Sequence, residues 1–163
     1  HLKKTYVVST SKRPPSNRKG SMGTPTGLHK IDEKIGAGSP PGIVFKSRRS
    51  TGFHFNERPA AEGESDFVTS RILWLRGLEP GVNDRARERA IVMHAADYVS
   101  DETVSTYGRL GRSWGCPALP EGVNDRIIDR IQGGTAVFAY YPDRDWLQSS
   151  RFINCPLRVA QNG

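Results

Sequence analysis

The hydrophobic positions of this chain fall in short runs that are separated by turn residues. The longest run covers residues 67–75 and is rich in β-branched and aromatic side chains, which favours a strand near the centre of a sheet. Shorter runs of similar character predict further strands at residues 5–9, 28–35, 43–46, 90–94 and 135–141. Because strands dominate, we expect a mainly β fold, either a compact sandwich or a partly closed barrel, with one or two short helices.

The helical patterns are few. Residues 124–131 place Ile127, Ile128 and Ile131 on one helical face, and a glycine pair that can end a helix follows them. A second short helix is expected around residues 101–107. The sequence at residues 81–85 recurs at 122–126. We interpret each copy as a turn with an Asn or Asp helix cap rather than as an internal repeat, because the flanking sequences differ.

Two polar segments interrupt the strands. Residues 10–21 form a basic loop that contains prolines, and residues 47–65 form a longer polar stretch. Irregular segments of more than about 12 residues are uncommon unless they are functional or disordered. We therefore expect residues 47–65 to be a flap that faces a substrate.

The length of 163 residues predicts a single domain. The chain has 24 Lys and Arg residues against 17 Asp and Glu, and the net charge of +7 favours polyanionic partners such as nucleic acid, an anionic cell wall or a membrane surface. The aromatic residues do not interleave with the basic ones as they do on base-stacking surfaces, so no nucleic acid is expected. No run approaches the roughly 20 apolar residues that cross a bilayer, so no membrane span is predicted.

A candidate for covalent chemistry is Cys116, which follows Ser113, Trp114 and Gly115. A thiol is a strong nucleophile only as the thiolate, which an imidazole within hydrogen-bond reach favours, and His94 ends the predicted strand upstream. Gly115 permits a tight turn in which the N–H groups of residues 114–116 could converge on an oxyanion. The alternative is a buried structural cysteine and a satisfied core histidine.

The run Ser113-Trp114-Gly115-Cys116, with His94 upstream, resembles the active-site signature of YkuD-type L,D-transpeptidases, whose usual form is His-Gly, a gap, then Ser-His-Gly-Cys. Residues 7–10 and 23–31 resemble the amino-terminal strand and the TPxG segment of that family, so the resemblance covers roughly residues 5–141.

The sequence departs from the usual motif at Ala95, at Trp114 and at Pro117-Ala118, and its Ser-Trp-Gly-Cys-Pro form is similar to a divergent branch of the family. The resemblance implies a compact β-sandwich of mixed sheets with the cysteine at the mouth of a cleft. Residues 1–163 would then be one catalytic domain, with a C-terminal extension at about 142–163.

The resemblance also implies roles for individual residues. Cys116 would be the nucleophile and His94 the general base, which takes the thiol proton and passes it to the leaving amine. The carbonyl of the residue after the histidine orients the imidazole in this family, and here that residue is Ala95. Asp97 is a competing side-chain acceptor.

The residues near the nucleophile have several open interpretations. Ser113 either bonds to the imidazole or holds the loop through a backbone contact. Trp114 has no acidic proton to exchange and would shape the cleft. Arg109 and Arg112 either grip substrate carboxylates or are solvated loop arginines, and Tyr98 is a weaker substrate-binding candidate.

The remaining histidines and the second cysteine receive structural interpretations. His54 is expected to be an exposed loop residue, and His29 to face solvent or a neighbouring strand. Cys155 is more simply a bystander thiol than the disulfide partner of Cys116. The histidines and cysteines show no metal-ligand spacing, so neither a metal nor another cofactor is predicted.

The function that the resemblance implies is a peptidoglycan-modifying cysteine acyltransferase. As an L,D-transpeptidase it would act on tetrapeptide stems through a Cys116 thioester and release D-alanine; with water as acceptor it would be an L,D-carboxypeptidase. A non-catalytic basic module that holds the cell wall is the alternative from another class. A papain-like protease is disfavoured because Pro117 and Pro120 oppose a helix at the nucleophile.

We expect a monomer in the periplasm or cell envelope. The chain begins at His1 rather than at a methionine, so an export signal could have been removed from it.

Overall fold

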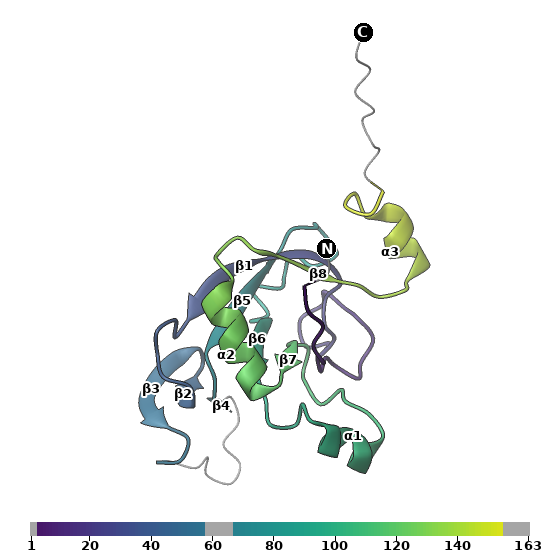
Figure 1. The fold of residues 1–163 in the computed structure, drawn as a ribbon. Coiled ribbons are helices and arrows are strands. Elements are labelled where there is room, and N and C mark those ends of the chain that lie inside the picture. Colours follow the sequence, from purple (N-terminus) through teal and green to yellow (C-terminus); the bar gives the residue numbers. More distant parts are fainter. Residues whose placement is uncertain (1–2, 58–66, 155–163) are drawn as a thin grey trace.

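The computed structural model describes residues 3–57 and 67–154, and these form a mainly β fold with two sheets (Figure 1). The first sheet consists of β1 (Gly27–Ile35), β5 (Ile72–Gly77), β6 (Val92–Ala95), β7 (Ala118–Leu119) and β8 (Ala136–Ala139). The second consists of β2 (Ile43–Lys46), β3 (Arg49–His54) and β4 (Phe67–Val68). The strand orders are β7-β6-β5-β1-β8 and β3-β2-β4. The first sheet is mixed, because β6 and β7 are parallel and its other pairs antiparallel, and this confirms the expected fold class.

Strand β5 lies in the middle of the five-stranded sheet, as the apolar run at residues 67–75 predicts. Both of its faces are buried, because Ile72 packs on one side of the sheet while Leu73 and Leu75 pack on the other. The run is not one continuous strand, however. Residues 69–71 leave the ladder and separate β4 from β5, so the prediction is wrong at this point.

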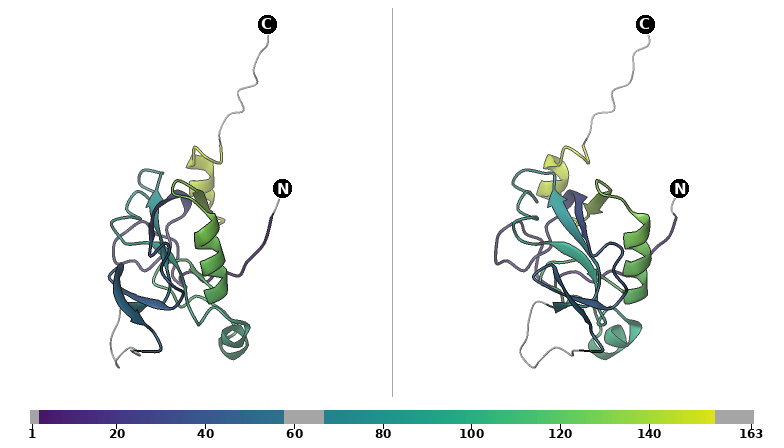
Figure 2. Two further views of the ribbon diagram at one scale, coloured as in Figure 1. Left: turned by 60° about the vertical axis from the view of Figure 1, so that its left-hand side comes forward. Right: turned by 90° about the vertical axis from the view of Figure 1, so that its left-hand side faces the viewer.

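Two apolar layers cover the two faces of the first sheet. On one face, helix α2 (Glu121–Arg130) packs Ile128 into the core. On the other face, Phe45 of β2 packs against Ile72, and Cys116 borders this layer. Figure 2 shows α2 on one side of the sheet and the β2–β3 pair toward the other. The candidate nucleophile therefore adjoins the layer between the two sheets.

Helix α1 (Asp101–Tyr107) has the predicted range. The hydroxyl of Ser100 accepts from Thr103 N at its start, and Gly108, with a left-handed φ of 69°, ends it. Helix α2 is also confirmed, but it begins at Glu121 rather than at residue 124.

A third helix, α3 (Arg144–Ser149), was not predicted. The side chain of Asp143 accepts from Trp146 N and caps it. The buried Trp146 ring lies 5.9 Å from the ring of Phe138 and 6.2 Å from that of Tyr140, measured between centroids. Aromatic contact with the end of β8 therefore holds α3 in place.

The repeated segment at residues 81–85 and 122–126 does not cap helices as expected. Asn83 is fully buried, and its side-chain amide donates to main-chain carbonyls at the start of β1. Asn124 is equally buried inside α2 and donates to the carbonyl of Arg71 at 2.8 Å. Each asparagine therefore ties its own segment to a distant one, and the first copy forms turns without a helix.

The prediction of a strand at residues 5–9 is wrong. In that segment only Ser9 bonds to a strand, through an isolated bridge in which it exchanges two backbone hydrogen bonds with Ala118. The polar stretch at residues 47–65 is also not wholly irregular, because its first part forms β3. Residues 58–65 of the expected flap lie outside the described residues.

Candidate functional site

The parallel pairing of β6 with β7 brings the candidate base beside the segment of the candidate nucleophile. His94 lies opposite Ala118, and its backbone N–H donates to the carbonyl of Pro117 at 3.3 Å. Cys116 directly precedes these two residues. The fold thus places the two residues on adjoining chain segments.

His94 is half-buried on β6, and its Nδ1 lies 2.7 Å from the carbonyl oxygen of Ala95. A carbonyl only accepts, so Nδ1 carries the proton and Nε2 has a free lone pair. Burial lowers the pKa of His94, and the bond to Ala95 opposes this shift. The imidazole is therefore neutral at pH 7. This is the contact that the resemblance implies, whereas Asp97 accepts from the backbone N–H of Tyr98.

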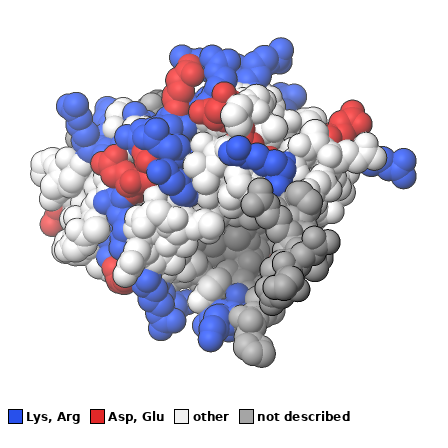
Figure 3. Space-filling view, turned by 90° about the horizontal axis from the view of Figure 1, so that it is seen from above, with Lys and Arg blue, Asp and Glu red and all other residues white. Residues whose placement is uncertain are grey.

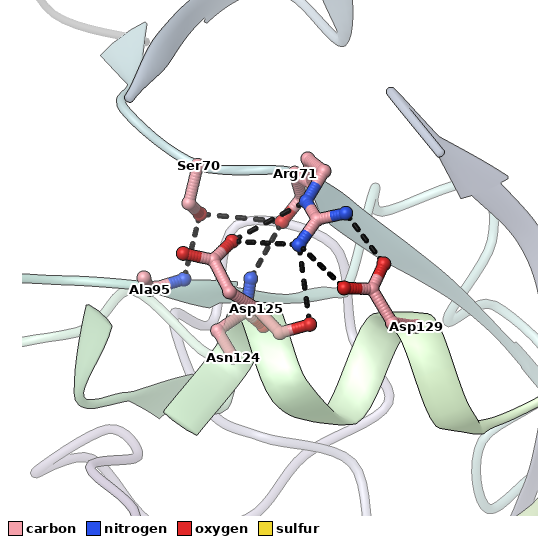
Figure 4. A network of polar contacts seen from close by, with 6 residues as sticks. All are labelled: Ser70, Arg71, Ala95, Asn124, Asp125 and Asp129. Atoms are coloured by element: carbon pink, nitrogen blue, oxygen red, sulfur yellow. Dashed lines mark hydrogen bonds and ion pairs between the residues drawn. The ribbon is translucent and has the colours of Figure 1, made fainter. Parts of the chain in front are cut away.

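The peptide groups on both sides of Ala95 are fixed. Its own N–H donates to the hydroxyl of Ser70 at 2.8 Å, a bond shown in Figure 4. The N–H of Ala96 donates to Leu119 O at 3.0 Å. Together these bonds set the direction of the carbonyl that accepts from His94, and hence the orientation of the ring.

An ion-pair network anchors the connection that carries Ser70. The side chain of Arg71 is only 6% exposed, and its guanidinium lies 3.1 Å from Asp125 and 2.6 Å from Asp129 on α2 (Figure 4). The carbonyl of Arg71 accepts from Asn124 Nδ2 and from the Ser70 hydroxyl. Burial opposes a charged Arg71, but the bonds to the two carboxylates raise its pKa. The network therefore locks α2 to the segment that positions β6.

Cys116 is a half-buried free thiol, and its Sγ donates to the carbonyl of Ala90 at 3.6 Å. Burial raises the pKa of Cys116, although the N–H of Val92 and nearby arginine charges oppose the shift. The resting group is thus a thiol whose partner is a main-chain carbonyl, not the His94 imidazole. Catalytic hydrogen bonds are often long or misaligned in unliganded enzymes and tighten when substrate binds.

Ser113 closes the turn that precedes Cys116. Its hydroxyl donates to Cys116 O at 2.5 Å and accepts from Gly115 N at 3.1 Å, so Ser113 holds the loop. The N–H of Gly115 is therefore occupied in this structure, which leaves the N–H groups of Trp114 and Cys116 as candidate oxyanion donors. Gly115 has a φ of 110°, and a Cβ there would lie 2.9 Å from the carbonyl oxygen of Gly23.

A groove of about 450 Å³ lies next to this turn. Five predicted site residues line it, namely Tyr98, Arg109, Arg112, Ser113 and Trp114. The side chain of Trp114 is exposed, and the Arg112 guanidinium lies 5.6 Å from the centre of the Tyr98 ring. The candidate nucleophile and base do not line the groove. The structure therefore gathers the substrate-binding candidates beside the thiol rather than around it.

Two further cations, Lys12 and Arg13, line the same groove, and none of its described lining residues carries a carboxylate. The sequence predicted that both lie in a basic loop at residues 10–21. The positive charge of this loop was the one sequence feature that could have indicated a role in the site, and the sequence analysis did not connect the loop with Cys116. Figure 3 shows that on the face seen from above, by contrast, acidic side chains stand among the basic ones. The groove is therefore suited to an anion that also offers apolar surface.

The structure corrects the prediction for His54 and excludes one of the two alternatives for His29. His54 is half-buried on β3, where its ring stacks on Phe55 with centroids 4.5 Å apart, so it is not an exposed loop residue. His29 is 1% exposed on β1, so it does not face solvent, and its Nδ1 lies 3.0 Å from Gly27 O. Cys155 and its possible pairing with Cys116 lie outside the described residues.

Sequence reasoning also missed Ser70, which lies 25 positions from its partner Ala95, and no local pattern indicates that contact. Within residues 3–57 and 67–154, no three His, Cys, Asp or Glu side chains gather as metal ligands would. In the same ranges, no helix has the length and apolar character that crossing a membrane requires.

Comparison with known proteins gave one family. The family model of the L,D-transpeptidase catalytic domain matches residues 49–140, more than half of the chain. An L,D-transpeptidase from Mycobacterium smegmatis is similar in structure, with a TM-score of 0.40 and 16% sequence identity. That match covers 83% of this chain and 48% of the other, so the chain spans about half the length of that protein. No curated protein matched the sequence.

Proposed function

Because the chain belongs to the L,D-transpeptidase catalytic domain family, we propose that it is a peptidoglycan-modifying cysteine acyltransferase that acts as an L,D-transpeptidase on tetrapeptide stems. The observation that carries the proposal is the bond from His94 Nδ1 to Ala95 O. It leaves Nε2 free as a base on the strand next to the Cys116 turn.

In the proposed reaction, Cys116 Sγ attacks the peptide carbonyl at the L-centre of the third stem residue. An S–C bond forms and the C–N bond to the terminal D-alanine breaks. His94 Nε2 takes the thiol proton and passes it to the leaving amine. The amine of a second stem then attacks the thioester carbonyl, which forms the cross-link and returns the proton to the sulfur.

The turn and the groove have separate parts in this proposal. The N–H groups of Trp114 and Cys116 are candidates to stabilise the oxyanion, since that of Gly115 is bonded to Ser113. Stem peptides carry several carboxylates, and the groove presents Arg109 and Arg112, while no described residue that lines it carries a carboxylate. We therefore propose that a stem binds along the groove with its reacting peptide bond extending past the turn toward the sulfur.

The test is incubation of the protein with defined disaccharide tetrapeptides, with products identified by mass. Cross-linked dimers are expected, and Cys116→Ala should abolish them while the matched thiol variant Cys155→Ala retains them. Intact-protein mass spectrometry with a carbapenem should show one adduct, located on Cys116. A Cys116→Ala protein that still processes stems would refute the proposal.

The same products separate the alternatives. Tripeptides without dimers would indicate an L,D-carboxypeptidase, in which water resolves the thioester. No turnover and no adduct, together with salt-sensitive retention on purified sacculi, would indicate a basic wall-binding module instead.

A further inference from the structure

Arg89 is a half-buried cation whose hydrogen bonds go to neutral groups. It precedes β6, and its guanidinium donates to the main-chain carbonyls of Ser16 and of Gly23, the latter at 2.7 Å. Its neighbours Arg85 and Arg87 form ion pairs with carboxylates, but none of the ion pairs of the described residues includes Arg89. Main-chain carbonyls orient the Arg89 guanidinium but carry no net charge. The positive charge of Arg89 is therefore not balanced by a negative group among these partners.

A partly buried charge without an ionic partner loses part of its hydration, which favours a nearby negative charge. Burial lowers the pKa of Arg89, and the charge of Arg85 acts in the same direction, whereas a negative charge on Cys116 would oppose both. A thiolate at Cys116 is therefore a group whose negative charge would balance this cation.

Two main-chain carbonyls link Arg89 to the nucleophile turn, one on the next residue and one that Arg89 itself bonds. The next residue, Ala90, has a left-handed φ of 54°, and its carbonyl receives the Cys116 thiol at 3.6 Å. The carbonyl of Gly23, which Arg89 holds, lies 2.9 Å from the position of a Cβ on Gly115. Arg89 thus clamps the amino-terminal segment onto the glycine that shapes the turn.

Other charged and titratable groups also face the thiol. Arg48, whose guanidinium stacks 4.6 Å from the centre of a Trp74 ring, favours the thiolate as Arg89 does. Burial and then the charge of Cys116 raise the pKa of Tyr98. Of the two arginines, Arg89 is the one whose hydrogen bonds hold a segment, at Gly23, that lies against Gly115 of the turn.

We propose that Arg89 is a positioning residue for the thiol chemistry: its fixed charge is the counter-charge of the Cys116 thiolate, and its two hydrogen bonds keep the nucleophile turn in place. The inference rests on the proposed function only in taking Cys116 as the reactive thiol. In this role Arg89 helps to activate Cys116 but does not contact the substrate.

The first test measures the rate of Cys116 alkylation by iodoacetamide as a function of pH, in the Cys155→Ala protein. Arg89→Gln should move the midpoint up by about one pH unit, which makes alkylation at neutral pH about tenfold slower. Arg89→Lys should restore most of the midpoint because it keeps the charge, and the matched control Arg85→Gln should leave it unchanged. An Arg89→Gln profile that superimposes on the parent profile would overturn the inference.

A second test needs no substitution at Arg89. In the Cys155→Ala protein, the ratio of the rates with anionic iodoacetate and neutral iodoacetamide reports the electrostatic potential at the sulfur. This ratio should exceed that of N-acetylcysteine amide severalfold. Equal ratios would overturn the inference even if Arg89→Gln does not fold. Neither test uses a stem peptide or a carbapenem, so the inference and the proposed function can fail independently.

Discussion

Replacing Gly115 with alanine should destabilise the protein by about 3 kcal/mol. Gly115 has a φ of 110°, and holding an L-residue at positive φ costs about 1–2 kcal/mol. The new Cβ would also lie 2.9 Å from Gly23 O and 3.4 Å from Ile91 Cδ1. Relieving such overpacking costs about 1–3 kcal/mol more, because Gly23 O is main chain and Arg89 holds it in place.

The loss can be measured by urea unfolding. With a slope of about 2 kcal/mol per molar urea, a loss of 3 kcal/mol lowers the midpoint by about 1.5 M. Gly108→Ala is the matched control, because Gly108 also has a positive φ, 69°, but nothing lies within 4 Å of its missing Cβ. That variant should lose only about 1 kcal/mol.

If the turn presents the oxyanion donors as proposed, the same substitution should slow carbapenem acylation of Cys116 about a hundredfold, since the turn must shift. Gly108→Ala should acylate at the parent rate. If Gly115→Ala loses no more stability than Gly108→Ala and acylates normally, then the contact between the turn and Gly23 does not constrain the site.

Two more substitutions test the buried groups. Arg71→Met should cost about 3 kcal/mol in urea unfolding, because it leaves the partly buried Asp125 carboxylate without its partner, and a loss under about 1 kcal/mol would contradict this. Burial lowers the pKa of His29 below its ordinary value of 6.5, so the unfolded chain binds a proton that the folded chain does not as pH falls. The free energy of unfolding should therefore decrease below about pH 6.5. His29→Gln should make this decrease shallower, and an unchanged pH dependence would refute the assignment.

The local pattern of residues was enough to predict most elements of the fold. Strands β1, β2, β5 and β8 and helix α1 follow from apolar spacing, turn residues and caps, which act over a few neighbouring positions. The local pattern gave wrong predictions where a side chain bonds to a residue far away in the sequence. Residues 69–71 leave the strand where Arg71 turns to Asp125 and Asp129, which lie 54 and 58 positions away. The asparagines at 83 and 124 look like caps, yet they bond across elements.

For the candidate site, the motif around Cys116 and the histidine on β6 could be recognised from residue types alone, because thiol, imidazole and glycine-turn chemistry belongs to those side chains. Their surroundings could not. Ser70 reaches Ala95 across 25 positions and Arg89 reaches Gly23 across 66. Whether a thiol is buried, which carbonyl it meets and which cation lies near it depend on how remote segments pack, and no local periodicity encodes that packing.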